Sequence, residues 1–235
     1  MLTFHVITLF PESLDSYLNA SIVKRAREKK QIAIKFYNPR DFVVPKKGKG
    51  KGKNKVGFLT YADRRVDDRP YGGGPGMVIE ALPVIKAIEK AVSKKLKTAA
   101  GRKNVRIIFF NPGGKMFKTS VADQLKNSTD IVLVSGRYEG IDARVKKVFP
   151  MVDLSIGEYT LTGGELPAMI LIDAITRRLP GVLGDGLSVE ESRIASHDVY
   201  TRPESFEYKG KKYKVPKVLL GGHHKKIDEW KLKKK

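Results

Sequence analysis

The hydrophobic residues of the chain gather in short apolar runs that alternate with longer amphipathic segments. The short runs are rich in β-branched and aromatic residues, and they predict five strands, at residues 2–9, 31–37, 105–110, 131–134 and 152–156. The run at 31–37 alternates cleanly between apolar and polar positions, which is typical of a strand with two different faces.

Helical spacing separates these runs. Pro11 and Glu12 open the first helical pattern, in which apolar residues recur every four positions, at Leu14, Leu18, Ile22 and Ala26. Further helices are predicted at residues 81–97, 120–126, 141–148 and 165–179. From residue 105 to 179 the order strand, loop, helix occurs three times, which predicts an α/β fold with a parallel sheet, right-handed crossovers and helices on both faces.

The pattern changes after Pro180. Residues 181–199 have few large apolar side chains and are predicted to be a linker, so that residues 1–180 form the main domain. Residues 200–220 contain extended pieces, and a short basic helix surrounds Trp230. From Lys209 to the end there are eleven lysines and two acids, so this C-terminal extension, residues 200–235, is expected to dock on the main domain or on a partner.

Glycine-rich loops follow three of the predicted strands, at residues 111–114, 135–142 and 155–167. Loops at the carboxyl ends of strands are where open α/β sheets bind ligands. Because glycine lets the backbone approach a ligand closely, these loops predict a pocket lined mainly by backbone.

Another glycine-rich segment, residues 66–77, has four glycines and two prolines in twelve residues. It is predicted to be a loop, and its Asp67, Asp68 and Arg69 are suited to recognising polar edges. An ordinary Ω-loop is the alternative interpretation.

The formal net charge of +21 predicts a polyanionic partner. Six lysines and no acid occupy residues 46–55, which favours a flexible arm along a phosphate backbone over a solvated hairpin tip. The chain has no cysteine, no apolar run of membrane-spanning length and no signal-peptide pattern, so we expect a cytoplasmic protein that does not enter a membrane.

Several strings of the sequence resemble one family. VDDRPYGGGPGM, GRYEGID, SIGEYTLTGGELPA, PGVLG, YTRPE and VPKVLLGGHH are similar to segments of the bacterial TrmD family, the tRNA (guanine-37-N1)-methyltransferases of the SPOUT class. The resemblance runs from Met1 to about Trp230. It implies an α/β fold with a deep trefoil knot, a homodimer, and tRNA, through its anticodon stem-loop, as the partner.

The resemblance also implies that S-adenosylmethionine binds in the glycine-rich loops. The implied cofactor-binding residues are Phe110, Asn111, Pro112, Gly136, Tyr138, Glu139, Gly140, Ile156, Gly157, Glu158, Tyr159, Thr160, Leu161, Gly163, Gly164 and Pro167. Independently of the family, a Rossmann cofactor site is not expected, because the first strand leads into Leu9-Phe10-Pro11-Glu12 without a glycine.

The implied reaction is methylation of guanine N1, which needs a general base. The family places an acid after PGVLG, and Glu191 takes that place here, with Asp198 as the alternative if the shortened segment changes register. Arg177 matches an arginine that contacts guanine, and Asp67 matches a position that reads the guanine edge. A solvated acidic turn is the alternative for Glu191, and a helix-terminal cation is the alternative for Arg177. The family also implies magnesium, for which no motif fixes a site.

Two departures from the family matter beyond the change at Glu191. Residues 46–55 are an insertion, and the chain ends near the point where the family continues into a helical RNA-binding domain, so we expect the lysine arm and tail to replace part of its charge. Methylation of tRNA guanine 37 is favoured. A SPOUT methyltransferase acting on another RNA site, or a non-catalytic RNA-binding relative, are the alternatives.

Overall fold

The computed structural model describes residues 1–43, 64–183 and 198–233. The chain forms two compact units, Met1–Val182 and Leu183–Lys235. The helices and strands of the first unit are, in chain order, β1 (Leu2–Ile7), α1 (Asp15–Leu18), α2 (Ser21–Glu28), β2 (Ile32–Tyr37), β3 (Asp67–Asp68), β4 (Val78–Ile79), α3 (Ala81–Leu96), α4 (Ala99–Asn104), β5 (Val105–Met116), α5 (Thr119–Leu125), β6 (Asp130–Val134), α6 (Arg144–Val148), β7 (Val152–Ser155) and α7 (Glu165–Thr176).

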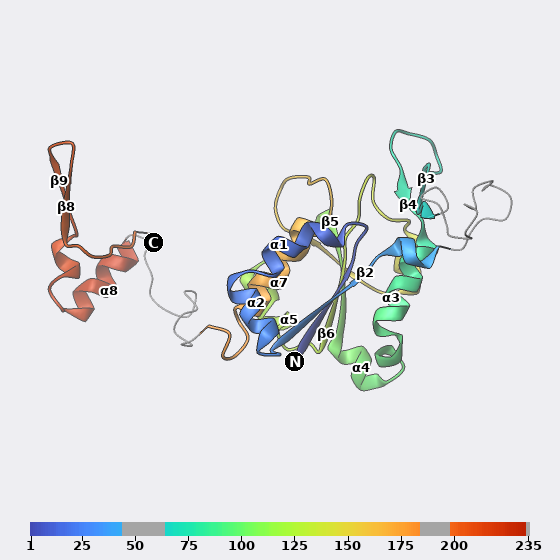
Figure 1. Cartoon of the computed structure of the whole chain (residues 1–235), viewed down its shortest axis with the longest axis horizontal. Helices are drawn as coiled ribbons and strands as arrows, with labels where there is room; N and C mark the ends of the chain where they lie inside the picture. Colours follow the sequence, from blue (N-terminus) through green and yellow to red (C-terminus); the bar gives the residue numbers. More distant parts are fainter. Residues whose placement is uncertain (44–63, 184–197, 234–235) are drawn as a thin grey trace, which may run out of the picture. The chain divides into compact units, whose positions relative to one another are not determined.

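A five-stranded sheet runs through the first unit in the order β2-β1-β6-β5-β7 (Figure 1). Every neighbouring pair is parallel, with β1 in register between β2 and β6. The predicted parallel sheet is confirmed. Because all strands run the same way, the loops that follow β5, β6 and β7 emerge at one edge of the sheet.

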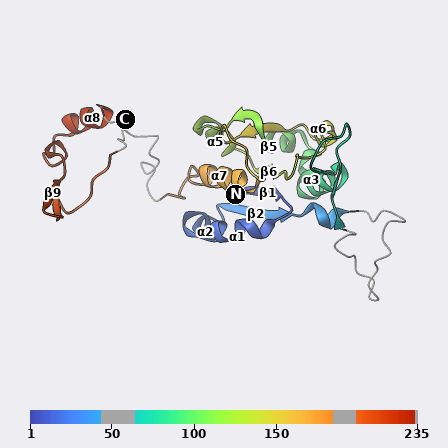
Figure 2. The same ribbon diagram turned by 90° about the horizontal axis from the view of Figure 1, so that it is seen from above.

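Helices cover both faces of this sheet. Alternate residues of each strand point to opposite faces, so Phe4 and Leu133 pack with α1, α2, α5 and α7, whereas Val132 and Val134 pack with α3 and α6. Figure 2 shows α1 and α2 side by side next to β2. Burial on both faces explains why the central strand β6 is buried at every position.

A polar cluster lies between the sheet and α3, where β6 begins. Nε2 of His5 donates to Oδ1 of Asp130 at 2.9 Å, and Nδ1 of His5 accepts from the Tyr37 hydroxyl at 3.1 Å. The Lys95 ammonium binds the other carboxylate oxygen of Asp130. Burial lowers the pKa of His5. Burial opposes ionisation of Asp130, but hydrogen bonds from Lys95, His5 and Thr129 outweigh it and hold the Asp130 pKa below its usual value.

Three details differ from the sequence-based predictions. The single helix predicted from Pro11 is broken, because Ala20 has an extended backbone, and Val23 rather than Ile22 enters the core. The strand predicted to end at Phe110 continues to Met116: both Phe110 and Lys115 pair with Leu154, so the predicted loop at 111–114 is a bulge inside β5. The helix predicted at 141–148 begins only at Arg144, since Ile141 pairs with Ile79.

The second unit contains a hairpin of β8 (Ser205–Tyr208) and β9 (Lys211–Lys214), followed by α8 (His224–Lys233). Tyr200 and Trp230 pack with ring centroids 6.1 Å apart. The helix expected around Trp230 is therefore present. Across both units, no helix among the described residues has the length and apolar character needed to cross a membrane.

Candidate functional site

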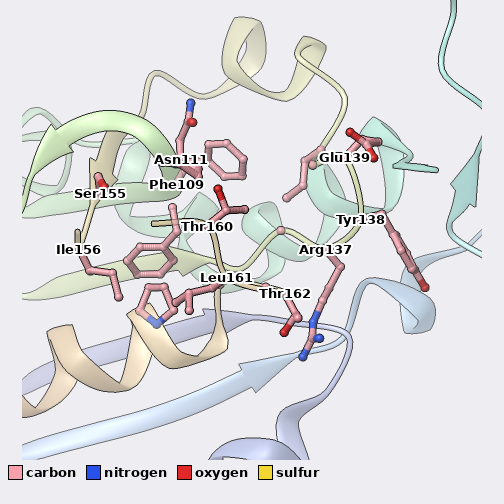
Figure 3. Close-up of a pocket in the computed structure, with 18 of the residues that line it drawn as sticks. Phe109, Asn111, Arg137, Tyr138, Glu139, Ser155, Ile156, Thr160, Leu161 and Thr162 are labelled. Atoms are coloured by element: carbon pink, nitrogen blue, oxygen red, sulfur yellow. The ribbon is translucent and has the colours of Figure 1, made fainter. Parts of the chain in front are cut away.

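A pocket of about 460 Å³ opens between the bulge of β5 and the loops that follow β6 and β7. Figure 3 shows Arg137, Tyr138 and Glu139 on the loop after β6, with Ile156, Thr160 and Leu161 on the loop after β7. The lining residues are Phe109, Phe110, Asn111, Pro112, Gly136, Arg137, Tyr138, Glu139, Gly140, Ile141, Ala143, Lys146, Ser155, Ile156, Tyr159, Thr160, Leu161, Thr162, Gly163, Gly164 and Pro167. The volume is that of a small-molecule site.

The loop after β6 is held by the glycine-rich segment 66–77 and by β4. The Glu139 N–H donates to the Met77 carbonyl, and the Ile79 N–H donates to the Gly140 carbonyl, both at 3.0 Å. Gly140 has φ of +118°, which favours glycine, and a Cβ atom there would meet nothing within 4 Å. The main chain at Gly140 is therefore open to a ligand in the pocket.

The loop after β7 returns to the loop after β6. Arg137 and Gly163 form an antiparallel bridge, and the Gly164 N–H donates to the Gly136 carbonyl at 3.0 Å. A Cβ atom on Gly164 would lie 2.6 Å from the Ser135 Cα, so only glycine permits this approach. The two loops are thereby joined backbone to backbone, and their contact forms one wall of the pocket.

A buried carboxylate lies behind this wall. Oε1 of Glu165, in the first turn of α7, accepts from the Thr8 hydroxyl at 2.7 Å, while Oε2 is 3.0 Å from the Arg137 Nε. The Arg137 guanidinium also lies over the Phe10 ring, 4.6 Å from its centroid. Glu165 is buried, with 4% of its surface exposed. Its ion pair therefore holds the side chain of Arg137, which lines the pocket, in one position.

The rest of the pocket lining mixes apolar and polar groups. Phe109, Ile156 and Leu161 give it an apolar surface suited to a flat ring. Nζ of Lys146 lies 4.8 Å from the centroid of Phe109 and 2.5 Å from Oδ2 of Asp153, which also accepts from the Asn111 amide at 3.0 Å. Asp153 thus orients both polar side chains at the bulge of β5.

The structure brings most of the predicted cofactor residues together. All of them line the pocket except Gly157 and Glu158, which lie in the same loop. Sequence reasoning missed the buried Glu165 behind the pocket, and seven residues of its lining: Phe109, Arg137, Ile141, Ala143, Lys146, Ser155 and Thr162. Arg137 lies inside the GRYEGID string, between the predicted cofactor residues Gly136 and Tyr138, and this position could have indicated that it lines the pocket.

Asp67 and Arg177, the predicted substrate-binding and catalytic residues that the structure describes in the first unit, are not among the lining residues. Asp67 belongs to β3, where its Oδ2 is 3.3 Å from the Arg65 Nη2, and Arg177 follows the last residue of α7. Asp198 is exposed in the second unit. Glu191 and the lysine arm at 46–55 lie outside the described residues. The segment that carries Asp67 does reach the pocket loop: a Cβ atom on Gly76 would lie 2.6 Å from Oε1 of Glu139.

No group of three or more acidic or histidine side chains suited to a metal ion occurs in residues 1–43, 64–183 and 198–233. A hard cation such as Mg²⁺ takes oxygen ligands, and it often keeps several waters and binds through substrate phosphates.

Comparison with known proteins identifies the family. The family model described as tRNA (Guanine-1)-methyltransferase TrmD matches residues 2–235. The chain belongs to the TrmD family. It is 42% identical to a tRNA (guanine-N(1)-)-methyltransferase of Clostridioides difficile strain 630 over 97% of this chain and 89% of that protein. Identity to the enzyme of the same name from Methylobacillus flagellatus is 43%, over 98% of this chain and 80% of that protein.

A TrmD-family crystal structure shares the fold. The tRNA (m1G37) methyltransferase from Aquifex aeolicus aligns with a TM-score of 0.70 and 35% sequence identity, covering 98% of this chain and 88% of that one. The five-stranded parallel sheet with helices on both faces is thus the family's α/β fold, and the pocket lies at the edge of that sheet where its loops converge.

Proposed function

We propose that this protein transfers a methyl group from S-adenosylmethionine to N1 of the guanine at position 37 of tRNA. The observation that carries the proposal is the pocket, in which the bulge of β5 and the loops after β6 and β7 bring together most of the residues that the family resemblance assigns to the cofactor. The tRNA (m1G37) methyltransferase name of the Aquifex aeolicus protein supports the position. A protein that lacks cysteine and acts on tRNA is expected in the cytoplasm.

The residues that line the pocket support S-adenosylmethionine as its ligand. Ile156 and Leu161 offer apolar sides to the adenine ring, and the backbone of the joined loops offers donors and acceptors to its edges. Glu139 lies on the wall where its carboxylate would meet the cationic part of the cofactor. When bound, the cofactor supplies an electrophilic methyl group.

The chain must supply the proton acceptor. Guanine N1 carries a proton at neutral pH, so a general base has to accept it as the methyl arrives, which typically contributes about 10²–10⁴-fold. Glu191 is the proposed base, and Asp198 is the alternative. Arg177 is proposed to stabilise the negative charge that develops on guanine O6, while Asp67 accepts from the guanine edge.

The decisive experiment measures transfer of labelled methyl to two tRNA transcripts that differ only in guanine or adenine at tRNA position 37. Glu191→Gln is run beside Glu190→Gln, a matched control with the same charge change one residue away. Label on the guanine transcript alone, lost only in Glu191→Gln, establishes the activity and the base. Label retained on the guanine transcript by the Glu191→Gln variant would exclude Glu191 as the base and favour Asp198. Label on neither transcript, despite cofactor binding, contradicts the proposed substrate.

A homodimer is proposed from the surface of α7. Leu166 and Ile170 are 53% and 44% exposed and lie one helical turn apart, so the helix presents an apolar stripe to its surroundings. The wild type should sediment as a dimer, and the Ile170→Glu variant should sediment more like a monomer. A monomeric wild-type protein would rule the dimer out.

A trefoil knot is proposed around the same pocket. The loop after β7 folds back on the loop after β6 through the Gly164 and Gly136 contact, in a sheet whose strand order departs from the sequence order. Pulling the chain by its ends should release less than its full contour length, because a tightened knot retains residues. Release of the full length would exclude the knot.

A further inference from the structure

The hairpin of β8 and β9 in the second unit is turned by two residues, Lys209 and Gly210, both with positive φ, of 51° and 73°. Such a turn matches the right-handed twist of the paired strands, and glycine suits its second position. Tyr208 is therefore opposite Lys211, and Phe206 is opposite Tyr213.

Strand alternation gives the hairpin two chemically different faces. Phe206, Tyr208, Lys211 and Tyr213 share one face, whereas Ser205, Glu207, Lys212 and Lys214 share the other. On the first face, called here the aromatic face, the rings of Phe206 and Tyr213 are stacked with centroids 5.4 Å apart and planes at 17°.

Ammonium groups surround these rings. Nζ of Lys209 lies 5.4 Å from the Tyr208 centroid, and Nζ of Lys211 lies 5.5 Å from the Tyr213 centroid. Four lysines and one acid, Glu207, occupy residues 205–214. The surface is thus strongly positive at the same place where it is aromatic.

Support of the hairpin itself accounts for only part of this arrangement. A cross-strand aromatic pair stabilises a hairpin. Yet Phe206 is 57%, Tyr208 59% and Tyr213 41% exposed, so much of each ring faces water rather than a neighbour. Rings open on one side and flanked by lysines are what proteins use to stack unpaired bases while neutralising the adjoining phosphates.

We propose that the aromatic face binds unpaired nucleotides of the RNA substrate by stacking. The identity of the RNA as tRNA rests on the proposed function, whereas the preference for unpaired nucleotides rests on the hairpin alone.

The test measures binding of the full chain to a labelled single-stranded RNA, to the duplex of the same sequence and to the tRNA transcript. Phe206→Val with Tyr213→Thr removes the rings and keeps residues that favour strands. We expect a loss of about fivefold or more on single-stranded RNA, the lower bound for one stacked base, and little change on the duplex. Trp230, the single tryptophan, packs on Tyr200 in the same unit and reports by fluorescence that the unit remains folded.

Two lysine variants keep the proposal testable should the ring variant unfold. Lys211→Gln and Lys212→Gln remove the same charge from adjacent positions on opposite faces. The first should weaken single-stranded binding and reduce its salt dependence, while the second should do neither. The stacking site would be overturned if both lysine variants weakened single-stranded binding equally. It would also be overturned if the ring variant lost the same affinity for single-stranded RNA and for the duplex. So would a ring variant that changes sedimentation while RNA binding is unchanged, because the face would then contact protein.

Methyl transfer by the wild type is measured in parallel. Ring-dependent RNA binding without transfer to the guanine transcript would leave the hairpin site standing and refute the proposed function. Methyl transfer to the guanine transcript, together with RNA binding that does not depend on the rings, would support the proposed function and refute the hairpin site.

Discussion

At the scale of single residues, Glu165 decides where a pocket side chain lies without lining the pocket itself. Its carboxylate accepts from Thr8 and pairs with Arg137. Glu165→Gln keeps the shape of the side chain but removes the negative charge that pairs with Arg137. We expect cofactor affinity to fall about tenfold.

Calorimetric titration with S-adenosylmethionine measures this loss. Glu89→Gln is the matched control, because Glu89 is exposed on α3 of the same unit and does not line the pocket. Equal losses in the two variants would show a general charge effect and contradict the positioning role of Glu165.

The sequence predicts most of the pocket lining but not the Glu165 contacts behind it. The glycine-rich strings indicated most of the pocket lining, since glycine marks a close approach of backbone regardless of the partner. The Glu165 pair could not be predicted, because Thr8 is 157 positions away along the chain and neither residue type is unusual. A buried carboxylate that contacts residues far away in the chain has no recognisable pattern in the sequence around it.

At the scale of elements, the junction between the loop after β6 and the start of α7 requires Gly164. Its φ of −84° is accessible to any residue, so the requirement is steric: a Cβ atom at this position would lie 2.6 Å from the Ser135 Cα. Gly164→Ala should force the two loops apart and cost about 1–3 kcal/mol of stability, as overpacking does, with a loss of cofactor binding.

Thermal unfolding and calorimetry check this expectation. Gly113→Ala is the control, since its Cβ atom would meet only the Asn111 Oδ1, at 3.7 Å. An alanine at position 164 that melts and binds as the wild type does would mean that the loops can separate without loss.

Element boundaries were less predictable than element types. The bulge in β5 was predicted as a loop because Asn111, Pro112 and two glycines do not favour a strand. However, Lys115 recovers the pairing with Leu154 beyond them. The break at Ala20 was missed for a related reason: apolar spacing of four continues through Leu14 and Leu18, and tertiary packing rather than spacing selected Val23. Pairing partners far along the chain settled both boundaries.

At the scale of the whole molecule, the His5 and Asp130 cluster couples the stability of the first unit to pH at the end of the sheet away from the pocket. The folded-state pKa of each group is lowered. The unfolded chain therefore binds more protons, so this stabilisation is complete above the unfolded pKa and is lost as pH falls. The loss begins near the ordinary histidine pKa of 6.5 and continues down to the folded pKa of His5, and Asp130 adds to it below the ordinary aspartate pKa of 3.8.

Denaturant unfolding followed by circular dichroism between pH 7.5 and 5 measures the His5 contribution. His5→Gln should flatten the pH dependence in this window, whereas His224→Gln, an exposed histidine of the second unit, should leave it unchanged. Trp230 fluorescence, which follows the second unit, should respond to neither variant. An unaltered slope in His5→Gln would assign the acid sensitivity to other groups. A flattened slope with unchanged cofactor affinity at pH 7.5 would show that one end of the sheet sets stability while the other binds the ligand.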